Sequence, residues 1–399
     1  MKALAERAIA CCRELATFTE EPDRTTRTFL SPPMRDVHRV LGAWMERLGM
    51  RVSVDAAGNL RGIRRLCASR RLLIASHLDT VPNAGAFDGV LGVVLGIALV
   101  DALADQCPDL AIEVIGFSEE EGVKFSVPFI GSRALVGTLD HALINSGVGD
   151  AIRAFGLDPA DIPKARLTPD TIGYLEFHIE QGPVLESLGL PLGIVDAIAG
   201  QSRLRFTFTG VANHAGTTPM NLRRDAITAA AEWIGCVEAL AGNTPGLVAT
   251  TGSISVEPNA TNVIAGLVRV SLDIRHPLDE TREAALNQLT TTAEQICQRR
   301  GITLVREQRL NQAAVPMNPH LTGLLTQAVT DAGFPIHRII SGAGHDAMII
   351  AAHVPAAMLF LRSPGGISHH PDESVITEDV AAALEVGLKF IERLEAAHV

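Results

Sequence analysis

Four separated stretches of the chain end apolar runs with side chains that bind metal ions. They are Ile74-Ala75-Ser76-His77-Leu78-Asp79 with the following Phe87-Asp88-Gly89, Ser118-Glu119-Glu120-Glu121-Gly122, Glu176-Phe177-His178, and Gly366-Ile367-Ser368-His369-His370. Together these stretches offer imidazole and carboxylate groups, the mixed nitrogen and oxygen ligands that suit a pair of zinc or manganese ions. The sequence therefore predicts a metal-dependent hydrolase.

Each of these residues also has an ordinary structural use. Asp88 precedes a predicted helix and could cap it, Glu119–Glu121 could be a solvated acidic turn, and His178 could be a hydrogen-bonded structural histidine. Three adjacent carboxylates nevertheless repel one another unless a cation compensates them. Asp79, two residues after His77, is placed to accept the other N–H of that imidazole. Because all four stretches lie at or near predicted strand ends, where sites in open α/β sheets gather, their joint occurrence favours a metal site.

The elements that must position these residues alternate between helix and strand in the first half of the chain. The predicted helices and strands are Met34–Met50 (helix), Arg51–Asp55 (strand), Leu72–Ala75 (strand), Val90–Leu103 (helix) and Ala111–Phe117 (strand). After Asn311 the alternation resumes with a helix near Leu321–Ala332, a strand at Ala356–Leu361 and a final helix from Thr377. This order predicts an α/β domain with a mostly parallel sheet that is covered on both faces.

The middle of the chain has a different pattern. Its predicted elements are Leu204–Thr209 (strand), Asp225–Leu240 (helix), Val248–Val256 (strand), Val263–Ile274 (strand), Asp279–Arg300 (helix) and Ile302–Arg309 (strand). The order βαββαβ is typical of a small α+β sandwich. We therefore expect a catalytic domain formed by residues 1–200 and 314–399, interrupted by an inserted α+β domain at residues 201–313.

Composition limits the classes of partner and the cellular location. With 399 residues, of which 47% are hydrophobic, the chain can form two large cores, and a net charge of -11 argues against nucleic acid or an anionic membrane as a partner. The first ten residues carry an early acid and do not resemble a secretory signal. The apolar stretch Gly89–Val100 is shorter than the roughly 20 residues that cross a bilayer. The six cysteines show no paired spacing, so we expect a cytoplasmic protein with reduced thiols.

Longer strings of residues connect the chain to a known family. They are Ser76-His77-Leu78-Asp79-Thr80-Val81-Pro82, Glu120-Glu121-Gly122, Phe177-His178-Ile179-Glu180-Gln181-Gly182-Pro183, His214-Ala215-Gly216-Thr217-Thr218-Pro219-Met220, Ser341-Gly342-Ala343-Gly344-His345-Asp346-Ala347 and Gly366-Ile367-Ser368-His369. Over nearly its whole length the chain resembles the dinuclear zinc amidohydrolases related to aminoacylases and carboxypeptidase G. Within them it is most similar to the branch of N-carbamoyl-L-amino-acid hydrolases, ureidopropionases and allantoate amidohydrolases.

The resemblance implies a role for each matched position of the metal site. Asp88 would bridge two divalent ions, zinc or manganese. His77 and His178 would complete one metal site, and Glu121 and His369 the other. Glu120 would be the general base, which activates water and passes the proton to the leaving nitrogen.

The resemblance also implies that the inserted domain acts as a lid and as a dimerisation surface of a homodimer. His214 would donate to the oxyanion, in some relatives from the partner subunit. Gln181, Asn262, Arg275 and His345 match positions that contact a small-molecule substrate, and Arg275 would clamp a substrate carboxylate through a bidentate pair. From the residues alone, His214 could be ordinary loop structure, Asn262 a turn residue and Arg275 a surface ion-pair partner.

Two features depart from the family pattern. His370 follows the expected ligand His369, where Asn or a small residue is more usual, so the sequence leaves the choice between the two histidines open. Glu119 adds a third carboxylate beside Glu120, and like-charge repulsion from it is expected to raise the pKa of Glu120.

The function predicted first is hydrolysis of an N-carbamoyl-L-amino acid or a related ureido acid such as allantoate, which releases ammonia and carbon dioxide. A second hypothesis keeps the same dinuclear site but changes the substrate to an N-acyl amino acid or a dipeptide. The third is a non-catalytic protein that keeps the fold and binds a small ligand. Loss of Glu120 or of a metal ligand would favour the third hypothesis, and neither is lost.

Overall fold

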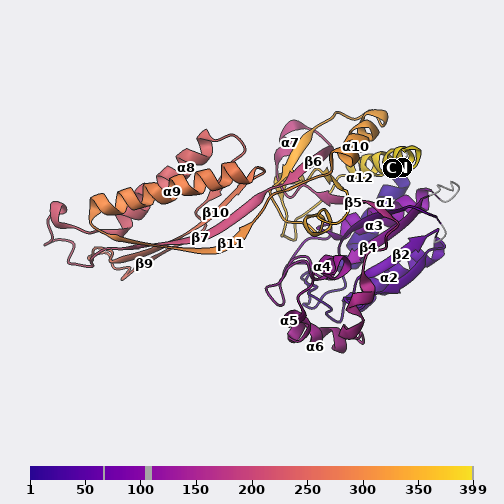
Figure 1. The fold of residues 1–399 in the computed structure, drawn as a ribbon, viewed down its shortest axis with the longest axis horizontal. Coiled ribbons are helices and arrows are strands. Elements are labelled where there is room, and N and C mark those ends of the chain that lie inside the picture. The colour runs from indigo at the N-terminus through magenta and orange to yellow at the C-terminus, as the bar shows by residue number, and fades with distance from the viewer. Residues whose placement is uncertain (66–67, 104–109, 398–399) are drawn as a thin grey trace. The chain divides into compact units, whose positions relative to one another are not determined.

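The computed structural model describes residues 1–65, 68–103 and 110–397. The chain divides into two compact units, each shown in Figure 1. The first unit comprises Met1–Asp196 and Met317–Val399, and the second comprises Ala197–Pro316. The boundaries expected from the sequence lay at residues 200/201 and 313/314. The observed division falls slightly outside them because β6 (Leu192–Ile198) runs almost directly into β7 (Gly200–Thr209).

The sheet of the first unit has four adjacent parallel strands at its centre, in the order β4, β3, β5, β14. The strands of this sheet are β1 (Arg51–Val54), β2 (Leu60–Arg64), β3 (Arg71–His77), β4 (Ala111–Phe117), β5 (Thr171–Ile179), β6, β12 (Val315–Pro316), β13 (Arg338–Ser341) and β14 (Ala356–Leu361). Antiparallel strands flank the centre, with β2 and β1 beyond β4 and with β6 beyond β14. Every residue of β4 and of β14 is buried, as expected for strands that are covered on both faces. The predicted α/β class with a parallel central sheet is confirmed.

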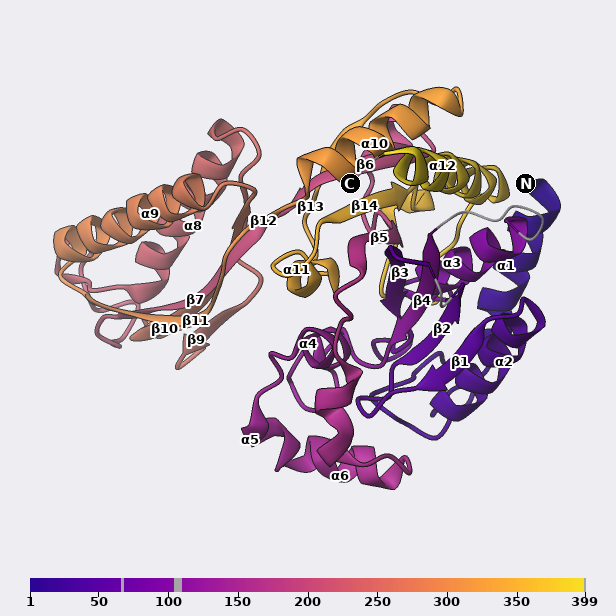
Figure 2. The same cartoon turned by 45° about the vertical axis from the view of Figure 1, so that its right-hand side comes forward.

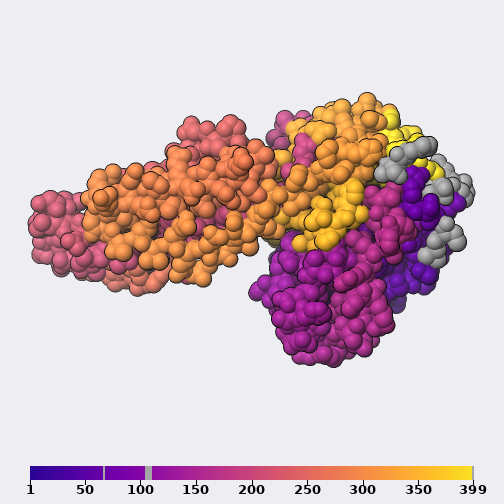
Figure 3. Space-filling model, viewed as in Figure 1, coloured from indigo at the N-terminus to yellow at the C-terminus, as the bar shows by residue number. Residues whose placement is uncertain are grey.

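The first unit also contains α-helices and short 3-10 helices. They are α1 (Lys2–Ala16), α2 (Met34–Arg47), α3 (Val90–Ala102), α4 (Ile130–Val136), α5 (His141–Ile144), α6 (Gly147–Ala154), η1 (Pro159–Ala165), α7 (Val184–Leu188), α10 (Pro319–Asp331), α11 (Ala347–Ile350), η3 (Pro364–Gly366) and α12 (Thr377–Ala396). Helix α3 is apolar all round and packs on β3, β4 and β5, which is why it is buried on every side. Helices α1 and α12, the first and the last, pack against each other. The segment from α4 to η1, purple to magenta in Figure 3, forms part of the surface of this unit.

The second unit is an antiparallel sheet with two helices on one face (Figure 2). Its elements are β7, η2 (Met220–Leu222), α8 (Ala226–Asn243), β8 (Val248–Thr250), β9 (Ile254–Glu257), β10 (Leu267–His276), α9 (Asp279–Arg300) and β11 (Thr303–Gln312). The strand order is β11, β7, β10, β8, with β9 also paired to β10. Burial alternates along β7 and β10, so one face of the sheet packs on α8 and α9 and the other is open. Trp233 stacks on Phe206 and donates its indole N–H to the carbonyl of Leu289 at 2.9 Å, which joins the sheet to both helices.

Two predicted strands of this unit differ from the structure. The single strand expected at Val248–Val256 is two short strands, β8 and β9, with a bend between them that the hydroxyl of Ser271 stabilises by accepting the N–H of Ser253 at 2.9 Å. Strand β10 begins at Leu267 rather than at Val263, because Val263 instead forms an isolated bridge with His214. The expected order βαββαβ is therefore βαβββαβ.

Among the helices in the described ranges, none is long and apolar enough to cross a membrane. Four cysteines are free thiols, namely Cys11, Cys12, Cys236 and Cys297. Cys67 and Cys107 lie outside the described residues.

Candidate metal centre

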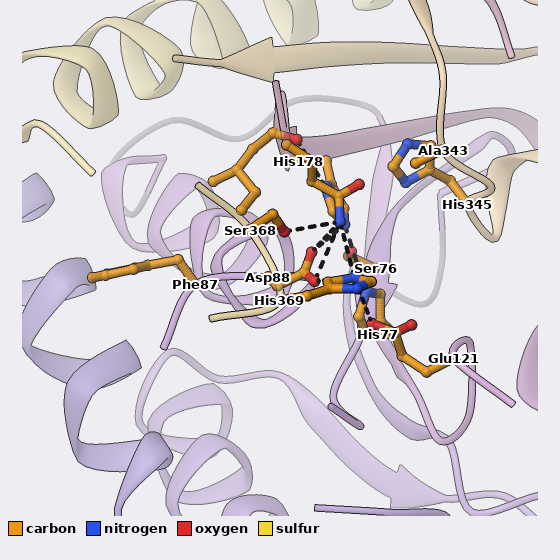
Figure 4. A network of polar contacts seen from close by, with 12 residues as sticks. Ser76, His77, Phe87, Asp88, Glu121, His178, Ala343, His345, Ser368 and His369 are labelled. Atoms are coloured by element: carbon orange, nitrogen blue, oxygen red, sulfur yellow. Dashed lines mark hydrogen bonds and ion pairs between the residues drawn. The ribbon is translucent and has the colours of Figure 1, made fainter. Parts of the chain in front are cut away.

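The parallel strands bring the predicted ligands to one edge of the sheet. His77 is the last residue of β3, and His178 is next to the last of β5. Glu120 and Glu121 follow the end of β4, and His369 lies in the segment after β14. Because β4, β3, β5 and β14 are neighbours, their carboxyl ends meet and these side chains converge, as Figure 4 shows for His77, His178, Glu121 and His369.

Asp88 enters the same space from the turn before α3. Its backbone N–H and that of Phe87 both donate to the Glu373 carboxylate, at 3.0 and 2.8 Å. The next residue, Gly89, has φ +66°, and a Cβ built there would lie 2.3 Å from Nε2 of His77. Only glycine combines that backbone conformation with this close approach. The turn that carries Asp88 therefore passes directly beside the ring of His77.

Asp88 lies at the middle of the cluster. Its Oδ1 is 3.4 Å from Nε2 of His178, and its Oδ2 is 3.1 Å from Nε2 of His369. Nε2 of His369 is also 3.4 Å from the carboxylate of Glu121, and the Nε2 atoms of His77 and His178 are 3.5 Å apart. Two ligand groups, one with His77 and His178 and one with Glu121 and His369, therefore share Asp88.

The hydrogen bonds of the two buried histidines show that this donor set fits a cation. Nδ1 of His77 is 3.0 Å from the carbonyl oxygen of Asp79, and Nδ1 of His178 is 2.9 Å from the carbonyl oxygen of Ile179. A carbonyl only accepts, so each Nδ1 carries a proton, and in a neutral ring each Nε2 presents a lone pair. Nε2 of His178 then lies 3.5 Å from Nε2 of His77 and 3.4 Å from an oxygen of Asp88, so a positive charge among these three atoms stabilises the arrangement.

The electrostatics differ between the two buried rings. Burial lowers the pKa of His178 to about 4, which keeps that ring neutral. Burial opposes a charge on His77 as well, but the hydrogen bond and the charge of Asp79 outweigh it and raise the pKa of His77. Burial alone would raise the pKa of Asp88, yet the hydrogen bond to His369 and the charges of His178 and His77 hold it below its ordinary range. The cluster therefore presents an ionised carboxylate between nitrogen ligands.

Glu120 is buried beside this cluster, and its carboxylate comes within 4.8 Å of ligand atoms of His77 and Glu121. Burial raises the pKa of Glu120 well above its ordinary value, the charge of His77 opposes the shift, and the charges of Glu121, Asp346 and Asp79 add to it. Burial, rather than like-charge repulsion, is thus the largest cause of the shift. The carboxyl of Glu119 is itself buried, which raises its pKa to about 9.

Asp79 contacts His77 in a different way from that expected. The imidazole N–H lies closer to the backbone oxygen of Asp79 than to its carboxylate, which is 3.5 Å away. The carboxylate instead accepts the backbone N–H of Glu120 at 3.0 and 3.1 Å and that of Glu121 at 3.1 Å. Asp79 thus connects the strand end that bears His77 to the turn that bears both glutamates.

The two adjacent histidines after β14 occupy different environments. His369, with φ +56°, directs its ring at Asp88 and Glu121. The ring of His370 accepts the N–H of Asp372 at 3.2 Å and lies 3.6 Å from its carboxylate, at the surface. The geometry therefore favours His369 as the ligand.

Gln181 and His345 lie in the first unit near the cluster. The amide nitrogen of Gln181 is 3.1 Å from Asp88 and 3.2 Å from the hydroxyl of Ser368. His345 is buried, with its Nε2 2.8 Å from the hydroxyl of Ser341 and its ring edge-on to His178 at 4.4 Å between centroids. Gln181 therefore contacts Asp88, and His345 contacts the ring of His178.

The other expected site residues belong to the second unit. His214 is exposed, and its Nδ1 accepts the backbone N–H groups of Gly216 and Thr217 at 3.1 and 3.2 Å, so Nε2 is the nitrogen left to donate. The carbonyl of Asn262 accepts the N–H of Ala215 at 2.9 Å, which places Asn262 beside the His214 loop. Arg275 directs two nitrogens at the carboxylate of Asp273, at 2.7 and 2.9 Å.

Two buried carboxylates that support the cluster received no role from the sequence. Glu176 accepts from the hydroxyl of Tyr174 at 2.8 Å and from the N–H of Ala347 at 3.0 Å, which ties β5 to the segment after His345. Glu373 holds the turn of Asp88, as described above. Glu176 carries a signal in the sequence, since it alternates with His178 on the strand. Glu373 carries none, because its partners are backbone groups almost 290 residues away.

Comparisons with known proteins agree with this geometry. A model of peptidase family M20/M25/M40 matches residues 73–393. Allantoate deiminase 1 of Glycine max is 38% identical, over 98% of this chain and 90% of that protein, and the N-carbamoyl-L-amino acid amidohydrolase of Geobacillus stearothermophilus is 37% identical, over 94% of each. The crystal structure of an amidase of the hydantoinase/carbamoylase family from Burkholderia multivorans has a TM-score of 0.91 and 29% identity, over 98% of this chain and 97% of that one. The chain therefore belongs to peptidase family M20/M25/M40.

Proposed function

We propose that the protein is a metal-dependent amidohydrolase that cleaves the C–N bond of a ureido acid, either an N-carbamoyl-L-amino acid or allantoate. The observation that carries the proposal is Asp88 placed between two ligand groups, with the buried carboxylate of Glu120 beside them. The names of the relatives, which are amidohydrolases and allantoate deiminases, support the ureido class of substrate.

The ligand groups would hold two divalent ions, zinc or manganese, with Asp88 shared, His77 and His178 on one side and Glu121 and His369 on the other. Mixed imidazole and carboxylate donors suit both metals. When bound, such ions supply Lewis-acid polarisation of the scissile carbonyl and lower the pKa of a bound water.

Glu120 would act as the general base and then as the general acid. Burial raises the pKa of its carboxyl, and a higher pKa makes the carboxylate a stronger base. The Asp79 carboxylate holds the backbone of Glu120 and so fixes where the carboxylate starts. Glu120 would take a proton from the attacking water and deliver it to the leaving nitrogen.

The second unit would supply oxyanion and carboxylate recognition. The Nε2–H of His214 suits a donor to a developing oxyanion, because its Nδ1 is committed to two backbone N–H groups. Arg275 would bind the substrate carboxylate, with Asp273 holding the guanidinium in place, and Asn262, Gln181 and His345 would add polar contacts. We further propose a homodimer in which the second unit serves as lid and dimerisation surface, so that His214 can act on the partner's site.

Product analysis tests the substrate class. The metal-loaded protein would be incubated with N-carbamoyl-L-amino acids, N-carbamoyl-β-alanine, allantoate, N-acetyl-L-amino acids and dipeptides. A ureido group consumes one water and yields ammonia, carbon dioxide and the free amine, whereas an acyl group yields only a carboxylic acid and the amine. Ammonia release from the ureido acids supports the proposal. Cleavage of only the acyl substrates or dipeptides contradicts it and moves the protein to the aminoacylase and peptidase side of the family.

A further inference from the structure

A cavity of about 510 Å³ lies in the first unit, on a part of the molecule that the proposed reaction does not use. It is bounded by the end of α1, by the loop of residues 17–25 and by the turn that leads to Asp88. None of the five metal ligands lines it. Its volume is in the range of sites that hold a small metabolite.

Two guanidinium groups at this cavity are available to a ligand. Within the described part of the chain, Arg13 forms no ion pair or side-chain hydrogen bond, and Arg24 has only a contact of 3.9 Å with the exposed Glu21. Guanidinium forks match the geometry of carboxylate and phosphate groups. Arg13 and Arg24 therefore give the cavity two positive charges that can bind an anion.

Backbone donors add to this set. The N–H groups of Gly85 and Ala86, which line the cavity, donate to no other residue in the described ranges. Their neighbours on both sides are satisfied, since the N–H of Ala84 donates to Thr25 and that of Phe87 to Glu373. Gly85 is buried and Ala86 is half-buried, and an acceptor seated in the cavity would pair both N–H groups.

The cavity also has apolar and acidic walls. Phe87 and the side chains of Ala16, Ala84, Ala86 and Pro371 give it an apolar part, which suits an organic rather than an inorganic anion. Of its two carboxylates, Glu373 already accepts two backbone N–H groups. Asp23 is exposed, and its negative charge weakens anion binding. Removal of that charge should therefore have the opposite effect to removal of the arginine charges.

The turn that forms one wall connects the cavity to the metal centre. Adjacent residues point in different directions, Asp88 into the ligand cluster and Phe87 away from it (Figure 4). Glu373, which also lines the cavity, holds both their backbone N–H groups and follows His369 by four residues. A molecule seated against Phe87 and Glu373 would therefore contact the residues that place Asp88.

We propose that this cavity is a regulatory site for a small organic anion, a carboxylate or phosphate with an apolar part. Arg13 and Arg24 bind the anionic group, the N–H groups of Gly85 and Ala86 complete its coordination, and Phe87 contacts the apolar part. A bound anion acts on the turn that carries Asp88 and so changes turnover at the metal centre. This effect on turnover rests on the proposed function, whereas binding of the anion does not.

Phenyl phosphate is the probe, and its binding to the metal-loaded protein is measured by isothermal titration calorimetry without substrate. Saturable binding to the wild type is expected. The affinity should fall at least tenfold in the Arg13→Gln/Arg24→Gln double variant and should not fall in Asp23→Asn. Arg39→Gln, an exposed arginine of α2 outside the cavity, is the matched control and keeps wild-type affinity. Lack of saturable binding, or equal affinity in the double variant, overturns the site, and the second outcome means that the probe binds outside this cavity.

The effect on turnover is measured with the substrate that the product analysis identifies. Phenyl phosphate is expected to change kcat or KM of the wild type at least twofold and to leave both unchanged in the double variant. An equal effect on both proteins indicates competition at the metal centre and contradicts the coupling, as does no effect on either. The calorimetric result does not depend on turnover, so failure of the proposed function and failure of the regulatory site are distinguishable.

Discussion

The carboxylate of Asp79 accepts the backbone N–H of Glu120 at 3.0 and 3.1 Å, while its own backbone carbonyl accepts from the imidazole of His77 at 3.0 Å. One residue thus positions a proposed metal ligand and the proposed general base. The substitution Asp79→Asn keeps the shape but removes the charge and one acceptor oxygen. Loss of such a supporting group costs about 10–100-fold in metal affinity or activity.

We therefore expect Asp79→Asn to lower kcat/KM for ammonia release by about 10–100-fold, with a matching loss in metal affinity. Asp36→Asn, an exposed aspartate of α2, is the control and keeps wild-type values. Steady-state kinetics and metal titration measure both quantities. Wild-type kinetics in Asp79→Asn would show that the hydrogen bonds to the glutamate turn do not matter for the reaction.

The two adjacent histidines give a matched pair of substitutions. His369→Ala removes a nitrogen within 3.4 Å of both Asp88 and Glu121, so it should reduce bound metal from two ions per chain to one and lower kcat at least 100-fold. His370→Ala removes a ring that contacts Asp372 at the surface and should leave both unchanged. Metal content per chain, measured by plasma emission spectroscopy, decides between them. The reverse pattern would make His370 the ligand.

Two glycines, Gly49 and Gly89, have similar positive φ angles but different surroundings. Gly49 has φ +72° and open space around it, whereas at Gly89, with φ +66°, a Cβ would collide with the ring of His77. Gly49→Ala should cost about 1–2 kcal/mol of unfolding free energy through its left-handed backbone and spare activity. At Gly89 the backbone has φ +66° and ψ -53°, so Gly89→Ala adds backbone strain and also displaces His77, and activity should fall below 1% of wild type. Equal activity in the two variants would contradict the proposed placement of His77.

His38 gives the first unit a pH-dependent stability. Burial, assisted by the charges of Arg27 and Arg35, lowers the pKa of His38 to about 4, below the ordinary value of 6.5. Between these pH values the unfolded chain binds a proton that the folded chain refuses, so stability falls as the pH falls through this window. The loss from this residue is on the order of 3 kcal/mol.

Denaturant unfolding between pH 7 and pH 4 measures this contribution. His38→Gln should lose less stability on acidification than the wild type, whereas His320→Gln, at an exposed histidine of α10, should behave as the wild type does. If His38→Gln and the wild type lose stability in parallel, the buried imidazole titrates normally and the explanation fails.

Much of the fold follows from local patterns. The run Val90–Val100 has only apolar residues and glycine, and β4 and β14 are apolar apart from Glu113. These patterns predict elements buried on all sides. The alternation along β7 and β10 predicts strands with one open face. The break between β8 and β9 could not be predicted in this way, because it depends on a hydrogen bond between Ser253 and Ser271 on another strand.

The site residues could be predicted where a sequence motif follows a strand. They could not be predicted where contacts between distant segments determine the position of a side chain. The strings around His77, Glu121, His178 and His369 name side chains that the structure brings together. The difference between His369 and His370 depends on backbone direction in an irregular segment. The position of Glu373 depends on backbone N–H groups in a distant turn, and no local spacing encodes that contact.

Ammonia release by Glu120→Gln tests whether Glu120 is the base of a metal-dependent reaction, because the substitution removes the proposed base and leaves the five proposed ligands in place. Glu378→Gln, an exposed glutamate, is the control. The metal-restored wild type and the control are expected to release ammonia from a ureido acid. Chelation of the metal is expected to stop ammonia release by both proteins. Glu120→Gln should bind the same amount of metal and react about 100- to 10,000-fold more slowly. A wild-type rate in Glu120→Gln, or ammonia release that chelation does not affect, would contradict the account.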